Sequence, residues 1–321
     1  MTRHAPLAAT EPSARSALFR RPFPRQLLLG VALVAIWWPV AWLHLKPPSD
    51  YYFFPLWLGY ILTLDGVVAW RTGSSLWRRG RGRFVLLFAM SVPFWWVFEW
   101  MNRYLQDWHY VTTQPYSWLQ YHALASLAFS TVVPAVLEGA ELLASFRAGH
   151  RLPQLPRWHV GGRGRVLFEV LGWTMVLLVV TVPRYAFPFA WLSVFCIVEP
   201  LNAALRRRSI AAFVRDGNWA PIWNVMLAAL GTGFFWEMWN SQAIPKWYYT
   251  VPFVGFAHVF EMPVLGYTGY LPFGLEIFAV YAMGSWLLRW RDQQYARVGA
   301  DDESPAAATA AAHLRCGNVG R

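Results

Sequence analysis

Two short motifs in this chain place a carboxyl group three residues before a carboxamide. Glu99 precedes Asn102 in the first motif, and Glu237 precedes Asn240 in the second. A spacing of three puts both side chains on one face of a helix, where they can bind a common partner. The chemistry open to such a pair is proton donation in a polar site or hydrogen bonding between neighbouring helices. Glu237 and Glu99 are therefore the candidate catalytic acids.

An aromatic cluster follows each of these motifs. Trp108-His-Tyr110 follows the first, and Trp247-Tyr-Tyr249 follows the second. Near the ends of membrane spans such rings favour the headgroup region, which explains them without a specific function. The alternative is an aromatic wall around a cavity for an apolar or cationic ligand, since ring faces stabilise positive charge. Under that alternative, the two glutamates lie at the base of the cavity.

The motifs belong to a longer internal repeat, because residues 93–138 recur in order at 231–276. The Glu-x-x-Asn motif returns after 138 residues, and Glu138 returns at the same offset as Glu276. Several matches in order at a nearly constant offset indicate a duplicated unit.

A Gly- and Pro-rich stretch, residues 261–276, lies where a helix is expected to enter the membrane. Broken backbone at membrane depth is tolerated where it lines a cavity or lies within protein. A simple helix kink is the alternative. The candidate substrate-binding residues are Asn102, Asn240, Trp108, Trp247, Tyr249, Glu261, Glu138 and Glu276.

Three histidines, His109, His122 and His258, fall towards the same side as the aromatic clusters. The spacing of His258 and Glu261 allows two metal ligands on one helical turn, but no zinc-protease or multi-histidine motif is present. Hydrogen-bonded or surface histidines are the alternative. We expect no metal and no cofactor, because nucleotide, haem and flavin motifs are also missing from the sequence.

The elements that must position these residues are membrane helices. The chain is 56% hydrophobic and 14% charged, and its apolar stretches reach the roughly 20 residues that cross a bilayer. A pI near 10.0 could indicate nucleic-acid binding, but the arginines stand in short blocks between apolar runs, as membrane topology requires. The expected partners are membrane lipid and a lipophilic small molecule, with no nucleic acid.

Hydropathy predicts an all-α polytopic membrane bundle of about eight transmembrane helices, arranged as two tandem parallel four-helix repeats. Four spans in each copy is an even number, so both copies enter the membrane from the same side. The predicted spans are 26–45, 53–70, 84–104, 119–145, 166–183, 187–205, 220–240 and 264–288.

Charge asymmetry predicts the orientation in the cytoplasmic (inner) membrane. With both termini cytoplasmic, 24 of the 28 Lys and Arg residues lie inside, in agreement with the positive-inside rule. The predicted parts are a basic N-terminus (1–25), a first repeat (26–146), a basic linker (147–165), a second repeat (166–290) and a disordered tail (291–321) that lacks an apolar face.

The order of motifs resembles that of the membrane-embedded lycopene cyclases of the heterodimeric or fused type. Trp236-Glu237, Trp247-Tyr-Tyr249 and Glu261-Met-Pro263 fall in a similar order, over roughly 35 residues of each half. Val264 and Leu265 follow Pro263, where that family has paired glutamates. The resemblance implies a duplicated helical enzyme that acts on a carotenoid-like substrate without a cofactor.

Three classes of function remain open from the sequence. An enzyme would protonate a carbon–carbon double bond of a lipophilic, isoprenoid-like substrate, with Glu237 or Glu99 as the acid. A proton- or cation-coupled transporter or channel would use the same carboxyl groups for binding and would show a polar path between the two faces. A non-catalytic membrane scaffold would need neither an apolar cavity nor such a path.

Overall fold

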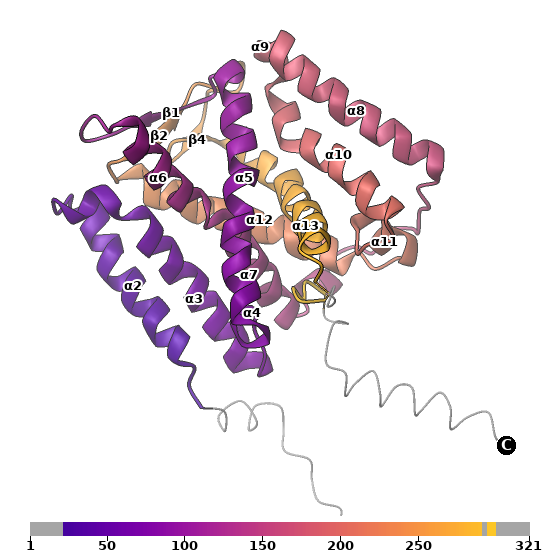
Figure 1. Cartoon of the computed structure of the whole chain (residues 1–321), viewed down its shortest axis with the longest axis horizontal. Coiled ribbons are helices and arrows are strands. Elements are labelled where there is room, and N and C mark those ends of the chain that lie inside the picture. Colours follow the sequence, from indigo (N-terminus) through magenta and orange to yellow (C-terminus); the bar gives the residue numbers. More distant parts are fainter. Residues whose placement is uncertain (1–21, 291–293, 300–321) are drawn as a thin grey trace, which may run out of the picture.

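The structure, a computed structural model, describes residues 22–290 and 294–299. The predicted N-terminus up to residue 21, most of the predicted tail and Cys316 lie outside the described residues. The described chain is mostly helical, as expected, with long helices packed along one another (Figure 1). Its helices are α2 (Arg25–Trp42), η1 (Pro48–Tyr51), α3 (Phe53–Thr72), α4 (Leu76–Arg79), α5 (Arg81–Leu105), α6 (Trp118–Phe129), α7 (Val132–Ser145), η2 (Ala148–Arg151), α8 (Gly162–Thr181), α9 (Pro183–Ala186), η3 (Phe187–Phe189), α10 (Ala190–Ala204), α11 (Ile210–Asp216), α12 (Ala220–Ser241), η4 (Val264–Gly269) and α13 (Tyr270–Leu287).

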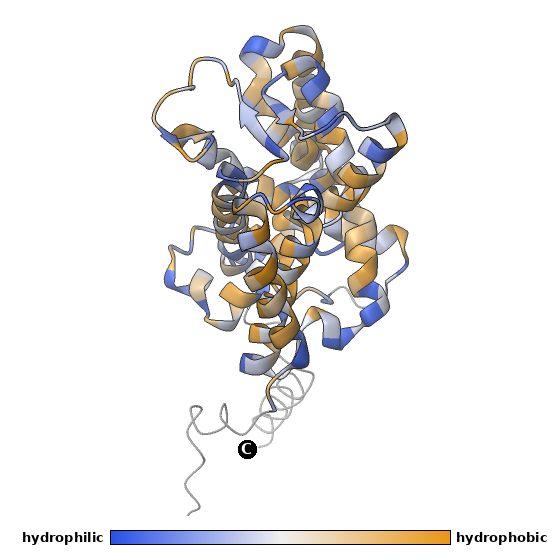
Figure 2. Ribbon diagram, turned by 90° about the vertical axis from the view of Figure 1, so that its left-hand side faces the viewer, coloured by the Kyte–Doolittle hydropathy of each residue, from blue (hydrophilic) through white to orange (hydrophobic). Residues whose placement is uncertain are grey.

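Six helical segments of the described chain are long and apolar enough to cross a membrane. Four of them are single long helices: α2, α3, α5 and α8. The other two combine consecutive helices, with α6 and α7 forming Trp118–Ser145 and α9, η3 and α10 forming Pro183–Ala204. Figure 2 shows apolar residues along the helices and hydrophilic residues mainly near their ends and in the loops. The length and composition of these segments are compatible with an integral membrane protein.

Two further predicted spans correspond to α12 and α13, which fall outside this set of six. Both helices are central, because α12 packs against α7 and α13, and α13 also packs against α10. More than half of the residues in each are buried. A helix surrounded by protein can carry polar side chains such as Asn224, Thr232 and Tyr281, which lower its mean hydropathy. By contrast, α2 and α8 are only 17% and 11% buried.

Small residues allow α2 and α3 to approach closely. A Cβ atom added to Gly30 would lie 2.4 Å from the Thr63 backbone nitrogen, and one added to Gly66 would lie 2.5 Å from Leu27 Cβ. Glycines at such a crossing increase van der Waals contact between membrane helices. This pair of helices is thereby fixed beside the rest of the bundle.

Two buried carboxyl groups, 134 residues apart in the sequence, each accept hydrogen bonds from the start of the short helix that follows. Asp65 in α3 accepts hydrogen bonds from Ser75 Oγ at 3.0 Å and from the Trp77 backbone nitrogen at 2.9 Å, at the start of α4. Glu199 in α10 accepts one from the Ala211 backbone nitrogen at 2.7 Å, at the start of α11. A carboxylate at a helix N-terminus satisfies backbone donors that have no intrahelical partner. Figure 1 shows α4 and α11 towards its lower side, opposite the strands.

Short strands interrupt the predicted all-α fold on the other side. β1 (Trp108–Val111) pairs antiparallel with β2 (Lys246–Tyr249), and β3 (His258–Val259) pairs with β4 (Met262–Pro263). In the first pair, Trp108 lies opposite Tyr249, and Tyr110 lies opposite Trp247. The two aromatic clusters of the sequence are thus joined directly, in a register centred on His109 and Tyr248. Equivalent segments paired in this way are related by a local two-fold axis through the ribbon.

Six residues of the predicted disordered tail are ordered in the structure. In the segment 294–299, Tyr295 is fully buried and its hydroxyl donates to the Leu76 carbonyl at 2.8 Å. Arg79 Nε donates to the Tyr295 carbonyl at 2.7 Å, and Asn224 Nδ2 donates to the Val298 carbonyl at 2.8 Å. The expectation of disorder is wrong for these six residues, because the bundle supplies hydrogen-bond partners that a local hydropathy pattern does not reveal. We call this stretch the C-terminal clasp.

Candidate functional site

The first Glu-x-x-Asn motif holds strand β1. Asn102 Nδ2 donates to the Trp108 carbonyl at 2.7 Å, while Asn102 Oδ1 accepts from the Asp107 backbone nitrogen at 2.9 Å. Glu99 Oε1 accepts from Trp108 Nε1 at 3.1 Å and from the Tyr110 hydroxyl at 2.6 Å. The carboxamide therefore fixes the backbone of the strand, and the carboxyl group fixes its aromatic side chains.

The second motif repeats this arrangement on β2. Asn240 Nδ2 donates to the Trp247 carbonyl at 2.7 Å, and Asn240 Oδ1 accepts from the Trp247 backbone nitrogen at 2.8 Å. Glu237 Oε1 accepts from the hydroxyl groups of Tyr249 at 2.8 Å and Tyr270 at 2.7 Å. The spacing of three thus gives each pair a common partner, as expected, and that partner is the strand that follows the helix.

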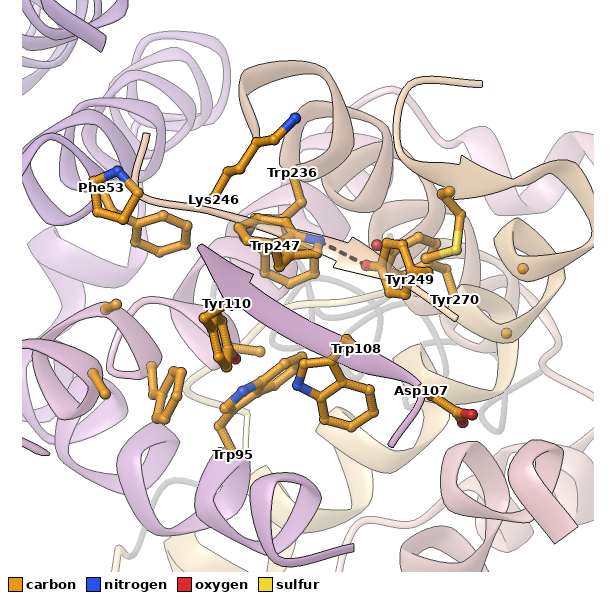
Figure 3. Close-up of a pocket in the computed structure, with 18 of the residues that line it drawn as sticks. Phe53, Trp95, Asp107, Trp108, Tyr110, Trp236, Lys246, Trp247, Tyr249 and Tyr270 are labelled. Atoms are coloured by element: carbon orange, nitrogen blue, oxygen red, sulfur yellow. Dashed lines mark hydrogen bonds between the residues drawn. The ribbon is translucent and has the colours of Figure 1, made fainter. Parts of the chain in front are cut away.

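A cavity of about 770 Å³ lies against this ribbon and is lined by both halves of the chain. Its volume is within the range of small-molecule sites, and most of its wall is aromatic or aliphatic (Figure 3). The two halves contribute corresponding pairs of residues. These are Phe54-Pro55 with Phe187-Pro188, Trp108 with Trp247, and Tyr110 with Tyr249.

The rim of this cavity includes apolar side chains beside the exposed Thr112 and Thr268. Tyr51, Leu127 and Leu265 line the cavity and are 49%, 44% and 48% exposed. A side chain that both lines a cavity and leaves about half of its surface exposed marks the border of the cavity. In a membrane protein, apolar side chains at such a border are compatible with contact to lipid.

The Gly- and Pro-rich stretch contributes to the cavity wall. Leu265, Gly266 and Gly269 of η4 line the cavity together with Pro272 of α13. The predicted span 264–288 therefore begins as a 3₁₀ helix, and the α-helix starts only at Tyr270. Of the two interpretations of this stretch, irregular backbone beside a cavity is the one found in the structure.

A second hollow, of about 560 Å³, also borders β1 and is more polar. Glu99 lines it together with Arg103, His109 and His122, whereas Tyr110 lines both this hollow and the aromatic cavity. Glu99 is only partly buried, but Glu237 is completely buried. The two carboxyl groups thus occupy equivalent places in the fold with different access to solvent.

The tyrosines between the carboxyl groups and the cavity are hydrogen-bond donors. Burial, and then the neighbouring Glu237, raises the pKa of Tyr249 well above its usual value. Burial and the neighbouring Glu99 raise the pKa of Tyr110 in the same way. Both hydroxyl groups therefore keep their protons at neutral pH and donate them in hydrogen bonds.

One acidic residue of the cavity, Asp107, was not identified from the sequence. Asp107 precedes Trp108 in the loop after α5, lines the aromatic cavity and is only 4% exposed. Burial raises the pKa of its carboxyl group to about 7. A single Asp in a short loop gives no pattern in the sequence, but its position one residue before the strand could have drawn attention to it.

Three predicted substrate-binding glutamates do not line the cavity. Glu138 is fully buried near Asp65 and Glu141, and Glu276 Oε1 accepts from the backbone nitrogens of Val194 at 3.1 Å and Phe195 at 3.4 Å. Glu261 pairs with Lys246 at 2.5 Å. Their contacts are with other protein groups, so their place in a repeat did not put them at the cavity.

Aromatic rings and hydroxyl groups surround the histidines. His109 Nε2 lies 2.8 Å from Thr250 Oγ1, and the His122 ring stacks on Trp96. His258 lies in β3, and Glu261 lies in the turn between β3 and β4, so the two residues do not share a helical turn. Among the described residues, no group of three or more His, Cys, Asp or Glu side chains could hold a metal ion.

Comparison with protein-family models, with curated proteins and with solved structures gave no significant match for this chain.

Proposed function

We propose that this membrane protein is an enzyme that binds a lipophilic, unsaturated substrate in the aromatic cavity and protonates one of its double bonds. The observation that carries the proposal is the placement of Glu99 and Glu237. Each carboxyl group is one hydrogen bond away from a tyrosine that lines a mainly apolar cavity. The order of motifs shared with the lycopene cyclases supports an isoprenoid or carotenoid-like substrate.

Protonation of an alkene needs an acid and a site that stabilises a carbocation. Glu237 has no Lys or Arg partner within the described residues, and its Oε2 is buried without a hydrogen bond there. The ring faces of Trp95, Trp236 and Trp247 in the cavity wall attract positive charge. An aromatic site of this kind lowers the free energy of a cationic intermediate relative to the neutral substrate.

The proton can pass through a tyrosine without forming a tyrosinate. In a concerted transfer, the hydroxyl of Tyr249 or Tyr270 turns from Glu237 towards the substrate, releases its proton to an alkene carbon and accepts the proton of the protonated Glu237 carboxyl group in exchange. Loss of a proton from a neighbouring carbon, which returns to the Glu237 carboxylate through the same tyrosine, ends the reaction as a cyclisation or an isomerisation. No oxidant or reductant is consumed.

Glu99 has a different place in this scheme. It lies between the polar hollow and Tyr110, so it can exchange protons with water on one side and with the cavity on the other. Glu237 is sealed from solvent. We assign initial protonation to Glu237 and proton exchange with water to Glu99.

The walls of the cavity favour an enzyme over a proton- or cation-coupled carrier. A carrier requires polar groups along a path to both faces, whereas this cavity is walled mainly by aromatic and aliphatic side chains. A scaffold requires no cavity.

We further propose eight spans in two tandem parallel repeats, with α12 and α13 as the seventh and eighth spans. Two features support this architecture: the two-fold register of β1 and β2, and the equivalent turns held by Asp65 and Glu199. A parallel repeat has its axis along the membrane normal and often has a binding site between its halves.

Reporter fusions test the orientation. A reporter inserted after Leu155, in the basic linker, and one at the C-terminus are expected to report the cytoplasm, because basic segments stay inside. A reporter after Gln114 is expected to report the opposite side. An external signal from the linker would contradict the parallel repeat.

Solvent deuterium tests the proposed chemistry. The detergent-solubilised full chain is incubated in D₂O buffer with lycopene and, separately, with squalene, and the recovered polyenes and products are analysed by mass spectrometry. Protonation at carbon is expected to introduce deuterium into at least one of the two, because Glu99 exchanges protons with water on one side and with the cavity on the other. Recovery of both polyenes unchanged and without deuterium would contradict acid catalysis on this substrate class.

A further inference from the structure

Asp107 is held rigidly beside the cavity. Its backbone nitrogen donates to Asn102 Oδ1 at 2.9 Å, and its carbonyl accepts from the Thr250 backbone nitrogen at 2.8 Å. Asn102 belongs to α5, and Thr250 follows β2. The carboxyl group is therefore positioned by both halves of the protein, at the start of the ribbon that borders the cavity.

One oxygen of the Asp107 carboxyl group lacks a partner among the described residues. The residue is only 4% exposed, and Oδ1 is buried without a hydrogen bond from any described residue. A buried polar atom without a partner costs about 1–3 kcal/mol, so its retention calls for an explanation such as a bound molecule. Figure 3 shows Asp107 at the edge of the cavity, on the side away from Phe53.

The equivalent position in the second half is satisfied. Lys246 stands one residue before Trp247, as Asp107 stands one residue before Trp108, and both line the cavity. Lys246 Nζ donates to Glu261 Oε1 at 2.5 Å. The repeat thus gives the cavity two nearly equivalent ends, one with a neutralised polar group and the other with an open hydrogen-bond acceptor.

We propose that Asp107 anchors a hydrogen-bond-donating end group, a hydroxyl, of the lipophilic ligand and so sets the direction in which the ligand lies. This inference rests on the proposed function, since it needs a lipophilic ligand in the aromatic cavity. An apolar chain fits the aromatic wall in either direction. The hydroxyl end is stabilised better at Asp107 than at the opposite end, because the opposite end offers a lysine already paired with Glu261.

Binding of a matched pair of polyenes tests the anchor. Retinol and retinyl methyl ether have the same chain, but only retinol has an O–H donor. Both accept excitation energy from tryptophan, and Trp95, Trp108 and Trp247 line the cavity, so quenching of tryptophan fluorescence in the detergent-solubilised full chain measures binding. At pH 8.5, above the pKa of about 7, retinol is expected to bind about tenfold or more tightly than the ether, as for a hydrogen bond to a charged group.

Variants assign this preference to one residue. Asp107→Leu is expected to remove the preference for retinol while it leaves binding of the ether nearly unchanged, and Asp107→Asn, which keeps an acceptor oxygen, is expected to retain part of it. Asp50→Leu is the matched control, because Asp50 lines the same cavity but already accepts from Thr113 Oγ1 at 2.7 Å. This control is expected to keep the full preference.

The outcomes separate the two proposals. Equal binding of retinol and the ether by the unmodified protein would overturn the anchor alone. Loss of the preference in Asp50→Leu, with the preference intact in both Asp107 variants, would overturn it as well. Absence of saturable quenching by either probe would overturn the ligand cavity itself and, with it, the proposed function.

Discussion

Glu237→Gln is expected to lower deuterium incorporation by a factor of about 100 or more, since general acid catalysis contributes about 10²–10⁴ to rates. Gln keeps the volume of the side chain, and its carbonyl oxygen can still accept from Tyr249 and Tyr270. The folded yield should therefore remain close to that of the unmodified protein. The measurement is the mass shift of the polyene after incubation in D₂O, at matched concentrations of folded protein.

Two further variants separate chemistry from packing at this position. Glu237→Leu should lower stability by about 1–3 kcal/mol, because the hydroxyls of the buried Tyr270 and the partly buried Tyr249 lose their acceptor. Glu169→Gln on α8 is the matched control, since Glu169 is partly exposed and does not line the cavity. It should leave both activity and melting unchanged. Normal incorporation by Glu237→Gln would remove Glu237 as the acid and leave it as a structural acceptor.

The largest loss of stability is expected from Asn102→Leu and Asn240→Leu. Each asparagine satisfies both the backbone nitrogen and the carbonyl of the following tryptophan, in a largely buried setting. Removing the carboxamide leaves at least two backbone groups without partners, at about 1–3 kcal/mol each. We expect a destabilisation of about 2–4 kcal/mol for either variant, measured as a lower midpoint of thermal unfolding followed by tryptophan fluorescence.

Asn218→Leu serves as the control for these variants. Its side chain is partly exposed and makes no hydrogen bond within the described chain, so its replacement should change the midpoint little. The equivalence of the two motifs also requires that Asn102→Leu and Asn240→Leu have similar effects. A normal midpoint in either one would show that its strand is held by other contacts.

The long helices and the shared partner of each Glu-x-x-Asn motif could be predicted from the sequence, because both depend on local patterns. Apolar runs set the long helices, and the spacing of three set Glu99 and Asn102 on one face with one partner. The strand pair could not be predicted in this way. Each of the two strands has only four residues, and their register depends on packing between segments about 139 residues apart.

Repetition in the sequence was a better guide to packing than to function. The segments that it matched at Trp108 and Trp247 lie in paired strands, but it also suggested Glu138 and Glu276 as ligand contacts, and these residues bind or face other parts of the protein. Asp107 lay outside the repeat pattern because its counterpart is a lysine. A search for similar residues does not find a position at which the two copies differ in charge. Such a difference, here Asp107 against Lys246, makes the two ends of the cavity unequal.

The C-terminal clasp limits how the two halves can move. Its residues contact Arg79 and Glu141 of the first half, and Asn224 and Tyr281 of the second. The ribbon of β1 and β2 joins the halves again, at the other end of the helices. A body fastened at both ends resists the rigid-body rocking by which alternating-access proteins open first to one side of the membrane and then to the other. Under the proposed function, a ligand would enter and leave the cavity by local movement between Tyr51, Leu127 and Leu265, and we expect the surrounding lipid to be both its source and its destination.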